Sequence, residues 1–181
     1  MCKIYSRIFL IGSLFFLFGL KAHAQNDPGI GIGAELGFPS GNFAGISGFG
    51  IGTSVKVDLP ISDPLAITLN GGVMNFFSKR NPFFKTQNFR YVPLKAGLKY
   101  ILSEGFYAEA QLGTSLPLNR DQKTLFVWSP GLGNLFRLNG NNKIDLGIRY
   151  EAWTGKNDNF ETRSINTKGF VGLRVAYVFG L

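Results

Sequence analysis

The chain has 181 residues, a formal net charge of +8, one cysteine and one histidine. This length fits a single domain. Its basic residues are scattered, without a basic helix or stripe, so the sequence does not indicate nucleic-acid binding. Glycine is abundant, with 24 residues, but it is neither periodic as in collagen nor clustered as in a linker. We therefore expect the glycines to lie inside regular elements.

Residues 1–24 have the features of a cleaved secretion signal. A positively charged start precedes an apolar run of 13 residues over 8–20, and Ala22-His23-Ala24 offers small residues to signal peptidase. The run is shorter than the ~18 to 20 residues that a membrane-spanning helix needs. Cleavage removes three basic residues and no acidic one, which leaves a single domain, 25–181, with a formal charge of +5.

The expected mature domain contains neither histidine nor cysteine, because Cys2 and His23 leave with the signal. Such a chain cannot build a Ser-His-Asp or Cys-His nucleophile, a Cys/His zinc site or a disulfide. Its carboxylates are spread one per segment rather than paired in a recognisable motif. We therefore expect no enzymatic activity, no metal and no cofactor.

Eight segments of the mature chain alternate apolar residues with small or polar ones, which is the period of a β-strand. The clearest is the last, in which Val171, Leu173 and Val175 share one face while Gly172 and Arg174 share the other. Turn residues separate the segments, and no helix is expected between them. The predicted strands cover residues 29–38, 46–59, 65–77, 89–102, 106–116, 125–138, 143–153 and 167–179.

The connections alternate in length. Those after the second, fourth and sixth strands are the short turns 60–64, 103–105 and 139–142, whereas the others include the polar stretches 78–88 and 154–166. Transmembrane barrels have an even number of strands, short periplasmic turns and longer external loops. The sequence therefore predicts an all-β fold, an eight-stranded antiparallel up-and-down transmembrane β-barrel with its N-terminus in the periplasm.

The composition of the non-apolar face favours a membrane barrel over a soluble one. A soluble periplasmic barrel that binds an apolar ligand would show the same alternation, with the apolar face inward. A face in water should then be rich in charged residues and threonine, yet this one is rich in glycine. Glycine fits the narrow lumen of an eight-stranded barrel. The apolar face then meets lipid, where closure of the barrel satisfies the backbone.

The tight turn at 103–105 predicts the register of one hairpin. If Leu102 pairs with Phe106, then Lys99 faces Glu109 on the inner side. Opposite charges on facing strands stabilise such a pairing. Glu35 and Arg174 offer a further pair of opposite charges that could close the ring between the first and last strands, where no short turn fixes the register.

The turn at 139–142 predicts a second register. If Leu138 pairs with Ile144, then Arg137 faces Asp145, and Arg149 faces a glycine. The inner-face charges then form ion pairs that either plug the lumen or line an ion path. Because a lumen of eight strands is just wide enough for side chains to fill, we favour the plug. The expected lumen residues are Glu35, Lys95, Lys99, Glu109, Arg137, Asp145, Arg149, Glu151 and Arg174.

The segment Tyr91-Val92-Pro93-Leu94-Lys95-Ala96-Gly97-Leu98-Lys99-Tyr100, together with the signal, the strands and the aromatic end, resembles the small outer-membrane barrels of the OmpA/OmpX-like, porin-like superfamily. The resemblance implies a place in the outer membrane of a Gram-negative-type bacterium, among lipid and lipopolysaccharide. It also implies folding by the outer-membrane assembly machinery, which reads a C-terminal strand ending in an aromatic residue. Here Gly180 and Leu181 follow the last aromatic. The resemblance implies no catalytic residue.

Three loop aromatics, Phe83, Phe84 and Phe160, are candidates for contact with an external partner, which the sequence does not identify. They fit the interfacial aromatic girdle equally well. The function expected from the sequence is that of a non-enzymatic outer-membrane barrel with a structural or surface-interaction role. The alternative is a narrow pore for ions or small solutes.

Overall fold

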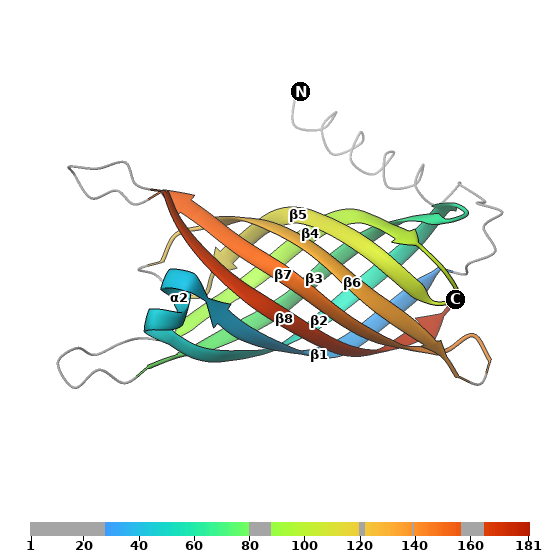
Figure 1. The fold of residues 1–181 in the computed structure, drawn as a ribbon, viewed down its shortest axis with the longest axis horizontal. Helices are drawn as coiled ribbons and strands as arrows, with labels where there is room; N and C mark the ends of the chain where they lie inside the picture. The colour runs from blue at the N-terminus through green and yellow to red at the C-terminus, as the bar shows by residue number, and fades with distance from the viewer. Residues whose placement is uncertain (1–27, 80–87, 120–121, 139, 157–164) are drawn as a thin grey trace, which may run out of the picture.

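The computed structural model describes residues 28–79, 88–119, 122–138, 140–156 and 165–181. The expected signal peptide and the loop aromatics Phe83, Phe84 and Phe160 lie outside these residues. Eight antiparallel strands close into a barrel in which each strand pairs with its neighbour in the chain and β1 pairs with β8 (Figure 1). The predicted fold class is therefore confirmed. The strands are β1 Gly29–Ser40, β2 Ser47–Ser62, β3 Leu65–Ser78, β4 Phe89–Ile101, β5 Phe106–Pro117, β6 Leu125–Arg137, β7 Lys143–Lys156 and β8 Ile165–Gly180.

The two ends of the barrel differ. The turns after β2, β4 and β6 lie at one end, together with the start of β1 and the C-terminus, and we call this the turn end (Figure 1). The longer connections after β1, β3, β5 and β7 lie at the other, the loop end. At the turn end the Leu181 amide donates to the Pro28 carbonyl over 2.9 Å, which extends the seam between the first and last strands.

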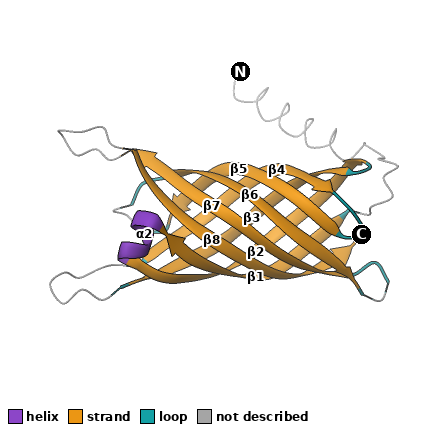
Figure 2. Ribbon diagram, viewed as in Figure 1, coloured by secondary structure: helices purple, strands orange, loops and turns teal. Residues whose placement is uncertain are grey.

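A six-residue helix, α2 (Gly41–Ile46), connects β1 and β2 at the loop end (Figure 2). The expectation that no helix lies between the strands is therefore wrong, because a helix this short gives no 3.6-residue period to read. Gly41 leaves β1 with a positive φ of 54°, which glycine adopts without steric cost. The side chain of Phe43 is only 1% exposed. In the part of the chain that the structure describes, no helix is long and apolar enough to cross a membrane.

The barrel has its apolar side chains on the outside. On β8, Leu173 and Val175 lie on the outer surface, whereas Arg174 between them is 4% exposed. The same alternation recurs around the barrel, with large apolar side chains outside and most charges of the strands inside. This is the reverse of a soluble domain and is typical of a transmembrane barrel. The alternative of a soluble barrel with an apolar interior is therefore wrong.

Several inner-face glycines make room for particular large side chains. A Cβ atom on Gly133 would collide with the ring of Tyr107. A Cβ on Gly50 would lie 2.6 Å from the ring of Phe76. Because real Cβ atoms do not approach this closely, each glycine provides a site where a long side chain from another strand packs against the wall.

Candidate functional site: the barrel lumen

The predicted register of the β4–β5 hairpin is confirmed. The Leu102 amide bonds to the Phe106 carbonyl over 2.8 Å, and Lys99 faces Glu109. Glu35 likewise faces Arg174 across the seam between β1 and β8. In both pairs the two opposite charges lie on the inner face of neighbouring strands, as the alternation of the sequence predicts.

The predicted register of the β6–β7 hairpin is wrong by two residues. The Leu138 amide donates to the Asn142 carbonyl over 2.9 Å, so Arg137 faces Lys143 instead of Asp145. Gly140, with a φ of 71°, sits in the three-residue loop that this bond closes, a common hairpin geometry with glycine in the left-handed region. A shift of two residues keeps every side chain on its face. It also leaves Arg137 exposed at the end of β6, apart from the other lumen charges.

Four of the predicted residues form one buried group, the loop-side cluster: Glu35, Lys95, Arg149 and Glu151. The Lys95 ammonium lies 2.6 Å from the Glu151 carboxylate, and the Arg149 Nε lies 2.7 Å from the same oxygen. Arg149 also pairs with Glu35. With two cations and two carboxylates, the loop-side cluster has no net charge.

Of the other five predicted residues, all but Arg137 belong to a second group, the turn-side cluster. This cluster also contains Lys56 and Asp58 of β2, which are not among the predicted lumen residues. Lys56 lies 2.9 Å from Asp145 and 3.3 Å from Glu109. Arg174 lies 2.7 Å from Asp145. This cluster also has equal numbers of cations and carboxylates, and it comprises Lys56, Asp58, Lys99, Glu109, Asp145 and Arg174.

The two clusters touch. The Arg174 Nε of the turn-side cluster lies 3.7 Å from the carboxylate of Glu35 in the loop-side cluster. Lys99 faces Glu109 along the wall, yet it pairs with Asp58 of β2. Charged side chains in this lumen therefore find partners across its curvature as well as on the neighbouring strand, which strand alternation alone does not predict.

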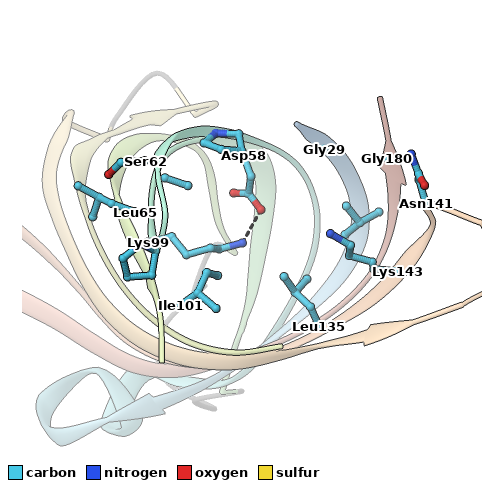
Figure 3. Close-up of a pocket in the computed structure, with 14 residues that line it drawn as sticks. Gly29, Asp58, Ser62, Leu65, Lys99, Ile101, Leu135, Asn141, Lys143 and Gly180 are labelled. Atoms are coloured by element: carbon cyan, nitrogen blue, oxygen red, sulfur yellow. Dashed lines mark hydrogen bonds and ion pairs between the residues drawn. The ribbon is translucent and has the colours of Figure 1, made fainter. Parts of the chain in front are cut away.

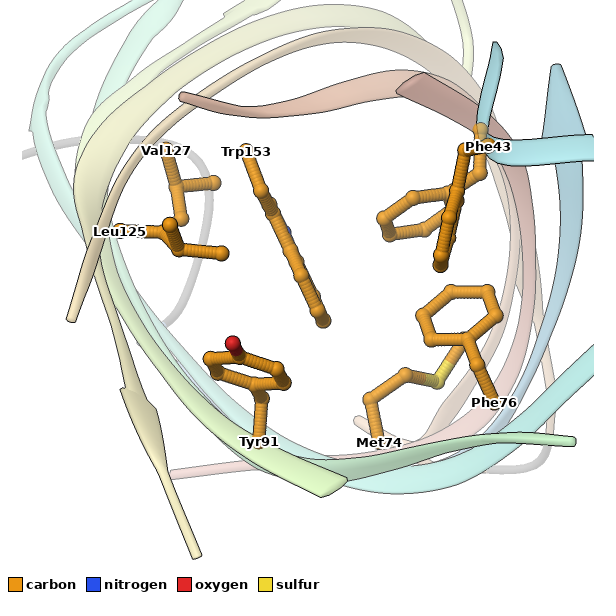
Figure 4. Close-up of a cluster of buried hydrophobic side chains, with 8 residues drawn as sticks. Phe43, Met74, Phe76, Tyr91, Leu125, Val127 and Trp153 are labelled. Carbon is orange, nitrogen blue, oxygen red and sulfur yellow. The ribbon is translucent and has the colours of Figure 1, made fainter. Parts of the chain in front are cut away.

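A layer of apolar side chains fills the lumen at the loop end, and the sequence reading missed it. Figure 4 shows Trp153 standing between Tyr91 on one side and Phe43 on the other. Its ring centre lies 5.0 Å from that of Tyr91 and 5.6 Å from that of Phe76. The inward position of Trp153, two residues beyond Glu151, was the available signal. This aromatic layer consists of Phe43, Met74, Phe76, Tyr91, Leu125, Val127, Trp153 and Phe170.

The aromatic layer is joined to the charges below it. The Trp153 indole donates a 2.7 Å hydrogen bond to the second oxygen of Glu151, whose first oxygen accepts from Lys95 and Arg149. The Ser129 hydroxyl also donates to the first oxygen, over 3.5 Å, so the Glu151 carboxylate is held on both oxygens by four donors. Both oxygens of this buried carboxylate are therefore occupied by hydrogen bonds.

Little free space remains between these side chains. A cavity of about 10 Å³ lies beside Glu35, Lys95 and Glu151, which is room for about one water molecule. A larger cavity of about 40 Å³ opens at the turn end, where Asp58 and Lys99 pair at its inner side (Figure 3). The described side chains therefore leave room for about one water molecule beside the loop-side cluster, and more free space at the turn end.

The family described as "Outer membrane protein beta-barrel domain" matches residues 11–179. The chain belongs to this family. Its place is accordingly the outer membrane of a Gram-negative bacterium, and the outward apolar surface of the barrel is the surface that lipid covers. The turn end faces the periplasm and the loop end faces outward, as in other barrels with short periplasmic turns.

Solved outer-membrane barrels share the fold. Neisserial surface protein A gives a TM-score of 0.59 at 12% identity, over 85% of this chain and 97% of that one. OprG from Pseudomonas aeruginosa gives 0.55 at 13% identity, over 90% and 100%. Ail from Yersinia pestis in a phospholipid nanodisc gives 0.54 at 18% identity, over 86% and 100%. A comparison with curated protein sequences gives no match.

Proposed function

We propose that this protein is a non-enzymatic outer-membrane barrel whose lumen is closed by two seals in series, one ionic and one aromatic. The observation that carries the proposal is the pairing of every charge in the two clusters, which leaves neither a free cation nor a free carboxylate to guide an ion. The role that follows is structural or one of surface interaction, with the barrel as an anchor in the envelope.

The ionic seal is costly to open. Most of its charges are buried, with Asp58 and Glu109 half-buried, and removing the partner of a buried charge leaves that charge without compensation in a region of low dielectric constant. A hydrated ion passing through would have to replace contacts such as the 2.6 Å pair of Lys95 and Glu151. The aromatic layer above offers no polar atoms along the faces of its rings, so it opposes ions for a separate reason.

The same pairing supports the absence of acid–base catalysis. A catalytic carboxyl or lysine must be able to reach a substrate. Here Glu151 and Asp145 are both completely buried and both held by cations. The domain 25–181 that we propose to remain after signal cleavage also contains no histidine or cysteine.

We infer that the outward rim contacts lipopolysaccharide. The two lumen clusters are neutral, and the described cations Lys79 and Arg90 lie exposed at the loop end. Basic side chains at this level suit the phosphates of the outer leaflet. For assembly, we propose that the outer-membrane machinery recognises β8, whose ladder continues through the bond of Leu181 to Pro28.

Conductance in planar bilayers tests the closed lumen. We expect the wild type, Arg149→Ala and Trp153→Ala to be silent, because each single variant keeps one seal. The double variant Arg149→Ala/Trp153→Ala should conduct and should prefer cations, because Glu35 and Glu151 lose a partner. Arg137→Ala/Trp153→Ala is the matched control and should stay silent, because Arg137 is outside the clusters.

The alternative function, a narrow pore, makes the opposite prediction for the wild type. Steady conductance of the unmodified barrel would refute the closed lumen and establish the pore. Each variant must first be shown to be folded, by its altered mobility in cold SDS compared with the boiled chain, so that a silent variant is not simply an unfolded one.

A further inference from the structure

Arg90 of β4 lies on the face of the barrel that lipid covers. It shares the outward positions of its strand with Leu94 and Leu98, whereas Lys95 between those two leucines is buried in the lumen. Among the strand side chains that the structure describes, Arg90 is the one charge on the outer face. No carboxylate of the described residues pairs with it. A charge that faces lipid is costly, so it needs a partner at its own level.

The neighbouring strands fix the position of Arg90 and place a second polar side chain beside it. Arg90 is paired in register with Asn75 of β3, and the Leu118 amide donates to the Arg90 carbonyl over 3.0 Å. The side-chain oxygen of Asn75 is buried and has no hydrogen-bond partner within the described chain. The outer wall thus holds a cation and a carboxamide side by side, and the described residues satisfy neither of them.

Two outward aromatic residues mark the level of this polar pair in the membrane. Phe77 follows Asn75 by two residues toward the loop end, and it is paired with Phe49 of β2. The two rings lie on the outer face with their centres 5.0 Å apart. In barrels of this class aromatic residues gather at the membrane–water interface. The head groups of the outer leaflet therefore lie at the level of Arg90.

An open apolar groove of about 600 Å³ lies on the same outer face, nearer the turn end. Its centre is formed by the small residues Gly71 of β3 and Ala96 of β4, and Leu94 and Leu112 border it. Gly71 is paired with Leu94, which is four residues from Arg90 on β4, or about 13 Å along the strand. The groove therefore begins within the length of an acyl chain from Arg90, on the face that lipid covers.

We propose that Arg90 and Asn75 bind a phosphate of lipopolysaccharide, while one of its acyl chains lies in the groove at Gly71. Arginine offers paired N–H donors to phosphate oxygens, and the asparagine carboxamide offers a further N–H. Lipid surrounds the groove in any case, so the groove contributes close packing and the phosphate contact supplies most of the affinity. The proposal rests on the proposed contact of the outward rim with lipopolysaccharide, and it assigns that contact a site on the wall.

Amide signals of the barrel in solution NMR test this site, in phosphatidylcholine nanodiscs with increasing amounts of lipopolysaccharide. We expect the amides of Arg90 and Gly71 to shift together and to saturate, because one molecule contacts both. Arg90→Gln should require about five times more lipopolysaccharide for the same shift at Gly71, the change expected when one basic residue near an anionic surface is removed. Arg137→Gln, at the opposite end of the barrel, is the matched control and should leave the titration unchanged.

Ala96→Leu tests the groove separately from the phosphate contact. The larger side chain fills the centre of the groove, so the shift at Gly71 should be lost while the shift at Arg90 remains. Ala34→Leu makes the same change on the outer face of β1, away from the groove, and should alter neither shift. The altered mobility in cold SDS establishes that each variant is folded.

An unchanged titration in Arg90→Gln would overturn the proposal. Equal saturation with phosphatidylglycerol, or with free inorganic phosphate, would also overturn it, because the site would then not be one for lipopolysaccharide. If lipopolysaccharide shifts the amide of Gly41 at the loop end but neither Arg90 nor Gly71, the rim contact stands and this site is wrong. If it shifts no amide of the barrel, the rim contact is wrong as well.

Discussion

Tyr107 and Asp145 are linked through the lumen by a 2.6 Å hydrogen bond that passes over β6, the strand between them. The tyrosine ring fits there because Gly133 of β6 has no side chain. Its hydroxyl also accepts a hydrogen bond of 3.4 Å from Lys56, and the Lys99 ammonium lies 4.3 Å from its ring centre. Tyr107, a neutral residue, therefore contacts three charged residues of the turn-side cluster and links them to one another.

Tyr107→Phe tests this link, since it keeps the ring and removes one donor to Asp145. We expect the free energy of unfolding to fall by about 1 to 3 kcal/mol, the usual cost of a buried hydrogen-bonding group left without its partner. Urea unfolding of the barrel in lipid vesicles measures the change. Tyr100→Phe, on the outer surface, should change stability by less than about 0.5 kcal/mol. Equal effects of the two variants would contradict the link.

A double-mutant cycle of Gly50 and Phe76 tests whether an inner-face glycine is needed to leave room for a large side chain. Gly50→Ala should destabilise the barrel by about 1 to 3 kcal/mol, because the new methyl group would lie 2.6 Å from the Phe76 ring in a packed layer. Combining it with Phe76→Leu should cost less than the sum of the two changes, with a coupling of about 1 kcal/mol.

Gly71→Ala is the control for that cycle. Gly71 lies on the outward face of β3, where a Cβ would approach only a terminal methyl of Leu94, at 3.2 Å. Little change in stability is expected. Strict additivity of Gly50→Ala and Phe76→Leu would show that Gly50 is needed for its backbone and not for the space it leaves.

The sequence predicted the barrel because each strand repeats one binary choice, apolar outward and small or polar inward. It also predicted that Lys99 faces Glu109, since the short turn before Phe106 permits few registers. The predicted register of the turn after Leu138 is wrong, because Leu138 bonds to Asn142 and does not pair with Ile144. Both closures place the same residues on the same face, so alternation could not distinguish them.

Other features of the lumen depend on the third dimension. Alternation assigns Lys56 and Trp153 to the inside, but it does not give their depth along the axis, which follows from the tilt and stagger of the strands. The partner of Lys99 is Asp58, two strands away on β2. Phe43 enters the lumen from α2, whose six residues are too few for periodic analysis.

Phe43→Ala tests how firmly α2 is held at the loop end. The Phe43 ring packs 4.9 Å from that of Phe76, and its removal should cost about 3 kcal/mol, at the low end for a buried phenylalanine. Hydrogen exchange of the α2 amides should accelerate as the helix detaches. Ile46→Ala, at an exposed position of the same helix, serves as the control and should leave exchange unchanged. Unaltered exchange in Phe43→Ala would mean that other contacts hold the helix.

Arg149→Met tests the balance of charge in the loop-side cluster. The change keeps much of the side-chain volume but leaves Glu35 and Glu151 without a shared cation, and breaking a buried pair in this way costs about 3 to 5 kcal/mol. Adding Glu35→Gln restores neutrality and should recover a large part of that loss in urea unfolding. Arg137→Met, the matched change outside the clusters, should have little effect.

Because the cluster is buried, the loss of stability in Arg149→Met should be nearly independent of salt between about 0.05 and 0.5 M, whereas surface pairs are screened over that range. A strong salt dependence, or no recovery with Glu35→Gln, would mean that the packing of Arg149, and not its charge, stabilises the lumen.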